Sequence, residues 1–152
     1  MQYLFYLLCY LLGSISFSYV LVKIFKNEDV REKGSKNAGA TNVMRNYGRP
    51  IGFFAFLLDY GKGFLAAFLS SHWNIGIPAL AVFFAALGHI FPVFFKFKGG
   101  KGVATTAGGF SAMSPSSILM GFVVFASFAI GTGYASVGSM ALMAYLFFYV
   151  AM

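Results

Sequence analysis

The stretch GVATTAGGFSAMSPSSILMGFVVFASFAIGTGYASVGSMALMAYLFFYVAM, residues 102–152, contains no Asp, Glu, Lys or Arg. A bilayer excludes charge from spans of about 20 residues, whereas a water-soluble domain needs charged groups along its whole length. The full chain of 152 residues is 59% hydrophobic and 20% aromatic, which leaves too little polar surface for a soluble fold. The sequence therefore predicts an all-α, polytopic helical membrane protein.

Apolar runs place the helices of this fold. Ser114-Pro115 divides the uncharged stretch, because proline lacks an amide donor and disfavours helix at the residue before it. The short helix before this break is either a span or a re-entrant piece, so about six transmembrane or partly inserted helices are expected, or five. No internal repeat or linker is visible, and we expect a single domain over residues 1–152. The predicted helices are residues 1–22, 51–71, 77–95, 103–113, 116–130 and 137–152.

Charge is concentrated in two loops. The chain has 11 basic and 4 acidic residues, and nearly all the basic ones lie in residues 23–49 and 96–101. Because Lys and Arg near span ends are retained in the cytoplasm, both loops are expected there, where they can meet, with the N-terminus outside. The uncharged connection around Trp73 fits the outer side. A nucleic-acid partner is not expected, since such a protein would not carry repeated uncharged spans.

The first loop contains GSKNAGATN, residues 34–42, in which small residues alternate with hydroxyl and amide side chains. Its glycines allow consecutive amides to face one anion, and Thr41 or Asn42 is expected to cap the short helix that follows. Arg45 is predicted one turn into that helix, near its positive end. This pattern indicates an oxyanion or phosphate cradle. Its candidate ligands are Gly34, Ser35, Asn37, Gly39, Thr41, Asn42 and Arg45.

The second loop, KGGKGVATT at residues 98–106, again places glycines, lysines and hydroxyls before a helix start. Two such loops on one membrane face predict one site for phosphorylated molecules at the bilayer surface. The alternative is a pair of interfacial loops whose basic residues meet anionic lipid heads. The candidate ligands here are Lys98, Gly99, Gly100, Lys101, Gly102 and Thr105.

Other reactive residues are sparse. No Ser-His-Asp or Cys-His arrangement can be drawn, Cys9 is the single cysteine, and no His and carboxylate cluster predicts a metal. Asp59 and Lys62 lie three residues apart within a span, so we expect them to neutralise each other while holding helices together or facing the polar site. His89 is either hydrogen-bonded to a backbone group or a donor that supports the second loop.

Several blocks together resemble a known family. Gly13-Ser14-Ile15, residues 34–43, Leu58-Asp59 with Lys62-Gly63, and GHIFPVFF at 88–95 running into FKGGKGVAT at 97–105 are similar to the bacterial acyl-phosphate-dependent glycerol-3-phosphate acyltransferases. The resemblance implies a multi-pass enzyme of the bacterial cytoplasmic membrane that starts phospholipid synthesis. It would transfer an acyl group from acyl phosphate to the primary hydroxyl of glycerol 3-phosphate, giving lysophosphatidic acid and phosphate, with no metal or other cofactor.

The resemblance also suggests roles for matched residues. Ser35, Thr41, Asn42 and the amides of residues 34–39 would hold the donor phosphate. Lys101 and Arg45 would counter the phosphates and the charge that develops during transfer. The catalytic candidates are therefore Lys101, Arg45 and Ser35, with His89, Lys98, Asp59 and Lys62 in support.

Two departures from the family pattern stand out. Lys36 occupies a position where family members often carry a small residue. The family's third cytoplasmic motif, with a His-Arg dipeptide, an Asn and a Gly-x-Glu, is not found, so the domain is expected to be C-terminally incomplete relative to the family. The alternatives are a catalytically impaired acyltransferase, a non-enzymatic phosphate- or phospholipid-binding membrane protein or transporter subunit, and a structural membrane subunit.

Overall fold

A computed structural model describes residues 1–151, with side chains placed through residue 150. The described part is helical and contains no strand. Two short 3-10 turns, η1 (Val30–Glu32) and η2 (Val93–Phe95), lie in the basic loops. The α-helices are α1 (Gln2–Gly13), α2 (Phe17–Lys26), α3 (Ala40–Tyr47), α4 (Arg49–His72), α5 (Pro78–Ile90), α6 (Val103–Met113), α7 (Pro115–Thr132) and α8 (Ala135–Ala151).

The helical membrane fold is confirmed, and α6 has the predicted bounds. Segments 2–26, 49–72, 78–95 and 115–132 are each long and apolar enough to cross a bilayer, and residues 135–150 form a shorter apolar helix. The predicted first and third spans are confirmed as apolar segments long enough to cross a bilayer, but each contains a break in its helix. The first predicted helix is two helices, because the Ser16 hydroxyl accepts the Tyr19 N–H and starts α2 afresh. The third ends at Ile90, since Phe91 precedes a proline.

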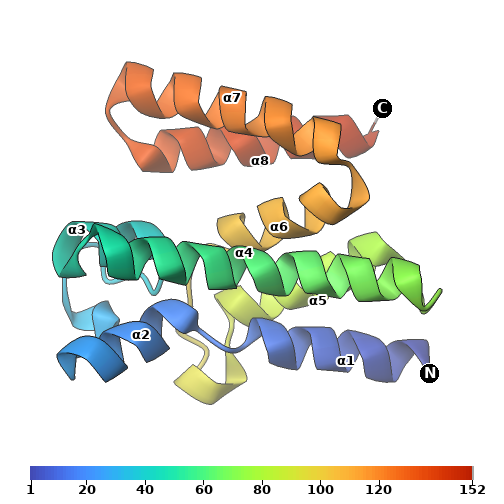
Figure 1. The fold of residues 1–152 in the computed structure, drawn as a ribbon, viewed down its shortest axis with the longest axis horizontal. Helices are drawn as coiled ribbons and strands as arrows, with labels where there is room; N and C mark the ends of the chain where they lie inside the picture. The colour runs from blue at the N-terminus through green and yellow to red at the C-terminus, as the bar shows by residue number, and fades with distance from the viewer. Residues whose placement is uncertain (152) are drawn as a thin grey trace.

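Figure 1 shows the helices lying roughly along one axis. The N-terminus and the α4–α5 turn lie at its right-hand end, whereas α2 and α3 lie at the left. The hairpin of α7 and α8 forms a separate upper layer, and α4 separates this layer from α1 and α2. The terminus and the turn around Trp73 are thus together, at the end opposite the first basic loop.

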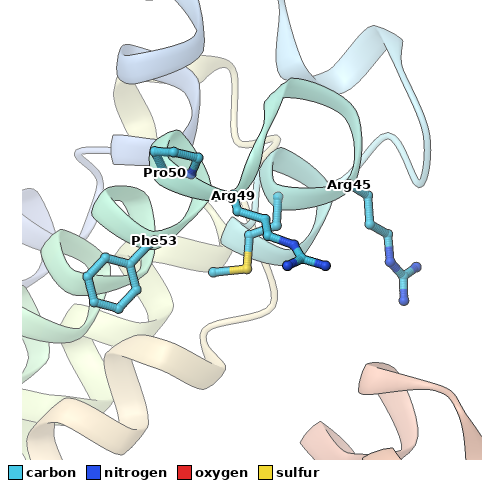
Figure 2. Close-up of a pocket in the computed structure, with 5 residues that line it drawn as sticks. Arg45, Arg49, Pro50 and Phe53 are labelled. Atoms are coloured by element: carbon cyan, nitrogen blue, oxygen red, sulfur yellow. The ribbon is translucent and has the colours of Figure 1, made fainter.

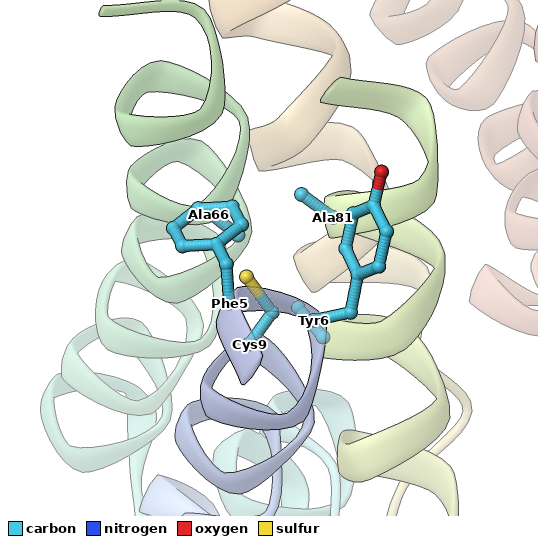
Figure 3. Packing of buried hydrophobic residues seen from close by; sticks show 6 residues of the cluster. Phe5, Tyr6, Cys9, Ala66 and Ala81 are labelled. Carbon is cyan, nitrogen blue, oxygen red and sulfur yellow. The ribbon is translucent and has the colours of Figure 1, made fainter. Parts of the chain in front are cut away.

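The interior combines a few large side chains with small residues that let the helices approach closely. Figure 3 shows Phe5, Tyr6 and Cys9 of α1 lying against Ala66 of α4 and Ala81 of α5. The outer surface is instead covered by large exposed apolar side chains, as expected for a protein whose solvent is lipid. Cys9 is buried in this cluster, which gives it a packing role.

Glycines allow α4 and α6 to touch backbone to backbone. A Cβ on Gly63 would overlap the carbonyl of Thr105, and a Cβ on Gly108 would overlap the carbonyl of Tyr60. Helices in bilayers associate largely through van der Waals packing, which is why small residues mark such interfaces. The contact fixes the start of α6, and hence the second basic loop, against the middle of α4.

This contact gives a matched prediction on one helix. We expect Gly63→Ala to destabilise the protein by about 1–3 kcal/mol, because the methyl group meets backbone that cannot move aside. Gly61→Ala has nothing within 4 Å of the added carbon and should stabilise α4 by up to about 1 kcal/mol. Thermal unfolding of the two variants in detergent checks the difference; equal transition temperatures would contradict it.

Candidate functional site

The two basic loops meet, as the sequence predicts. The Ala38 N–H donates to the Gly99 carbonyl at 3.4 Å, and the Arg31 guanidinium donates through Nη1 to the Phe95 carbonyl at 3.0 Å. Asp29 holds that guanidinium through a 2.7 Å contact with Nη2. The side-chain hydrogen bonds from Arg31 lower the pKa of the Asp29 carboxyl, so the carboxylate stays charged and the bridge stays formed at neutral pH.

At this junction two helices begin with open amides. The N-caps of α3 and α6 are Gly39 and Gly102, and neither end has a side-chain cap. The N–H groups of Ala40, Thr41, Val103 and Ala104 donate to no other group within residues 1–151. Helix starts of this kind attract anions, because their free amides and the helix dipole both favour negative charge.

Glycine conformation shapes both loops. Gly34 and Gly102 have φ of +58° and +78°, the left-handed region in which other residues are strained. Gly39 has an extended backbone that any residue adopts, so its expected conformational role is not supported. Gly99 and Gly100 have no room for a side chain: a Cβ would overlap the His89 carbonyl at the first and the His89 ring at the second.

The predicted helix cap is wrong, because Asn42 serves the loop instead. Its Oδ1 accepts the Ser35 N–H at 3.0 Å and the Asn46 Nδ2 at 2.9 Å, while its Nδ2 donates to the carbonyls of Val30 and Lys33 at 3.0 and 3.1 Å. These four bonds fill the hydrogen-bonding capacity of the buried amide. Asn42 therefore holds the loop in shape, whereas Ser35 and Thr41 are exposed.

Arg45 also differs from its prediction. It lies in the last turn of α3 rather than near the positive end, because this helix has only eight residues. There its charge complements the negative end of the helix dipole. Its exposed side chain lines an open pocket of about 740 Å³ together with Met44, Arg49, Pro50 and Phe53. Figure 2 shows the guanidinium groups of Arg45 and Arg49 extending into the same open region, with the Phe53 ring on the far side of Arg49 from Arg45.

Sequence reasoning did not single out Arg49 or Phe53 as site residues. Arg49 was visible only as one of many basic residues, and Phe53 only as one of 20 phenylalanines. Their signal is the helical spacing from residue 49 to residue 53, which places a cation and an aromatic ring on one face of α4.

Behind the second loop lies a buried ionic cluster. Lys62 Nζ is 2.9 Å from Asp59 Oδ1, which confirms the predicted pair. Both side chains are 1% exposed, and the same Nζ lies 2.9 Å from His89 Nδ1. The cluster joins α4 to α5 and, through the carbonyls of Gly13 and Ile15, to the break between α1 and α2.

The other predicted residues are divided between surface and interior. Lys98 and Lys101 are exposed, and Asn37 lies half-buried with its Nδ2 near Gly39. Thr105 is fully buried, and its hydroxyl has no hydrogen-bond partner among the described residues. Within residues 1–151 no group of three or more His, Cys, Asp or Glu side chains is placed to hold a metal.

Lys36 adopts a left-handed backbone, with φ of +57°. A side chain there costs about 1 kcal/mol, and glycine removes that cost. We therefore expect Lys36→Gly to make the first loop more stable than Lys36→Ala, which loses the same charge but keeps the strain. Limited proteolysis between residues 33 and 39 measures this. Faster cleavage of the glycine variant would contradict the explanation.

Fold and site together define a polytopic helical membrane protein with two basic, glycine-rich helix starts side by side. The family model described as "Glycerol-3-phosphate acyltransferase" matches residues 3–152, and the chain belongs to this family.

Individual relatives agree with this assignment. The glycerol-3-phosphate acyltransferase of Mycoplasma mobile is 44% identical over 88% of this chain, and that of Aquifex aeolicus is 43% identical over 93%. This chain spans 59% and 76% of the lengths of those two proteins. The crystal structure of PlsY (YgiH), an integral membrane glycerol 3-phosphate acyltransferase, in its glycerol 3-phosphate form has a TM-score of 0.89 and 40% identity, covering 99% of this chain and 77% of that chain.

Proposed function

We propose that this chain transfers an acyl group from acyl phosphate to the primary hydroxyl of glycerol 3-phosphate, giving lysophosphatidic acid and inorganic phosphate. The observation that carries the proposal is the junction of the two loops, where the free amides of α3 and α6 lie beside Lys101. Family membership and a second PlsY structure, described as the lysophosphatidic acid form with a TM-score of 0.84, support the substrate class.

The chemistry needs positioning more than activation. Acyl phosphate is a mixed anhydride, so the acceptor oxygen attacks the acyl carbon, and the bond from that carbon to the bridging phosphate oxygen breaks. Inorganic phosphate leaves with the electron pair, and a phosphate oxygen takes the hydroxyl proton. The amides and Lys101 stabilise the charge that grows on the carbonyl oxygen and the leaving group, and fixed geometry supplies much of the remaining rate.

The pocket of Arg45, Arg49 and Phe53 suits the acyl donor. Two guanidinium groups match a phosphate, while Phe53 and Met44 offer an apolar surface where α4 turns toward lipid. The donor would thus reach the junction along the membrane surface with its chain against α4. Ser35, Thr41 and the loop amides would hold its phosphate, and Asn42 would act through the shape of the loop.

Membrane placement follows the same proposal. Both basic loops would face the cytoplasm of a bacterium, with the N-terminus and Trp73 outside, because Lys and Arg are retained on the inner side. No metal or other cofactor takes part in this scheme. The partners are the two phosphorylated substrates and the surrounding lipids.

Incubating the purified protein with palmitoyl phosphate and glycerol 3-phosphate, and measuring phosphate release, tests the proposal. We expect release that depends on glycerol 3-phosphate and is not supported by glycerol. Binding of both phosphorylated molecules without release would contradict the enzyme and indicate a phosphate-binding membrane protein or an impaired acyltransferase.

A further inference from the structure

Lys62 has more neighbours than it has hydrogens to donate. Its Nζ lies 2.9 Å from the Gly13 carbonyl, 2.8 Å from the Ile15 carbonyl and 2.9 Å from His89 Nδ1. An ammonium group has three N–H donors, and these three partners use all of them. Asp59 Oδ1, also 2.9 Å away, accepts no hydrogen bond from any described residue and acts as the counter-charge.

This arrangement decides the state of the His89 ring. If Nδ1 carried a hydrogen, the ring would direct a donor toward an ammonium 2.9 Å away. The alternative partner of such a hydrogen, Asp59 Oδ1, lies farther away, at 3.4 Å. Nδ1 is therefore the acceptor, and the neutral ring carries its hydrogen on Nε2.

The Nε2 atom faces the junction of the two loops. It borders the position that a side chain on Gly100 would occupy, and the Ala38 carbonyl of the first loop borders the same position. The Gly100 N–H donates to the His89 carbonyl at 3.0 Å, so ring and loop are held together. Nε2 makes no hydrogen bond to any other part of the chain that the structure describes.

We infer that Lys62 locks His89 in its Nε2–H tautomer, so that His89 presents a fixed, neutral hydrogen-bond donor to a phosphoryl oxygen bound between the loops. His89 is then a binding residue, whereas Lys62 and Asp59 are positioning residues that act through it. The inference rests on the proposed function for the identity of the phosphorylated ligand, but the state of the ring is independent of turnover.

Nuclear magnetic resonance can read the ring directly, because the chain has only two histidines. His72 stacks on Phe68 at the far end of α4 and serves as an internal reference, and His72→Gln assigns the signals. In protein labelled with ¹⁵N-histidine at neutral pH, we expect His89 to show a protonated Nε2 and an unprotonated Nδ1. Adding glycerol 3-phosphate or inorganic phosphate should shift the Nε2 signal of His89 and leave His72 unchanged. A protonated Nδ1, or an Nε2 signal that neither ligand moves, overturns the inference.

Two substitutions separate the ends of the ring. His89→Asn keeps an oxygen near the Nδ1 position to accept from Lys62 but removes the Nε2–H donor. His89→Gln keeps an amide donor near the Nε2 position. We expect His89→Asn to raise the KM for a phosphorylated substrate about tenfold with its unfolding temperature retained, and His89→Gln to restore most of that loss.

The outcomes also distinguish this inference from the proposed function. A wild-type protein that shows the Nε2–H ring and the phosphate-dependent shift but no acyl transfer refutes only the enzyme. An active wild-type enzyme whose His89→Asn variant keeps its KM refutes only the role of His89.

Discussion

Replacing Lys101 by alanine should lower acyl transfer by about 10²- to 10³-fold while leaving the protein folded. Lys101 is exposed between the Gly99–Gly100 turn and the open start of α6, and its side chain makes no ion pair with the described residues. Its charge is thus free for the phosphoryl groups. A loss of this size is typical when one preorganised group that stabilises transition-state charge is removed.

The measurement is the initial rate of phosphate release with palmitoyl phosphate and glycerol 3-phosphate. Lys26→Ala is the matched control, because Lys26 is an exposed lysine at the end of α2 and lies outside the loop junction. The control should keep its rate, and both variants should unfold at the wild-type temperature. Near-normal turnover of Lys101→Ala would remove Lys101 from the mechanism.

Breaking the buried pair should have the largest effect on stability. Asp59→Leu leaves the Lys62 ammonium in a site that is 1% exposed without its counter-charge, and we expect a loss of about 3–5 kcal/mol. The double variant Asp59→Leu/Lys62→Met should recover part of the loss, because apolar replacement of a whole buried pair is far less costly. Recovery will not be complete, since the Gly13 and Ile15 carbonyls lose their donor.

Thermal unfolding in detergent, followed by the fluorescence of the single Trp73, measures these changes. Lys33→Met breaks the exposed pair of Lys33 with Glu28 and is the control; its unfolding transition should stay where it is. A double variant less stable than Asp59→Leu alone would contradict the predicted recovery.

Local signals were enough to predict much of the fold. The bounds of α6 follow from Gly102 at one end and Pro115 just past the other, because both residues act on the backbone of their neighbours. The break within the first predicted helix has no comparable local signal. This break, at Ser14–Ser16, is supported by Lys62, which lies 47 residues beyond Ile15 in the chain, and apolar residues continue on both sides of the break. Hydrophobicity along the chain therefore could not reveal it.

The candidate site likewise combines features that the local sequence predicts with features that depend on tertiary contacts. The glycines, lysines and hydroxyls of the two loops were visible because their types and spacing favour anion binding, and their meeting is confirmed. The direction of individual side chains was not visible. The hydrogen-bonding capacity of the Asn42 side chain is filled by Ser35, Asn46, Val30 and Lys33. Arg45 shares a pocket with Phe53.

By itself, the sequence determined that this protein is helical and embedded in a membrane, and that its basic, glycine-rich loops suit phosphorylated ligands. These properties depend on residue type and on spacing within a few turns, which the chain carries locally. The tertiary structure alone decided that Lys62 closes the gap between α1 and α2 and faces His89, and that His89 in turn backs the Gly99–Gly100 turn. Such contacts join residues far apart in the chain, so their hydrogen bonds exist only once the helices have packed.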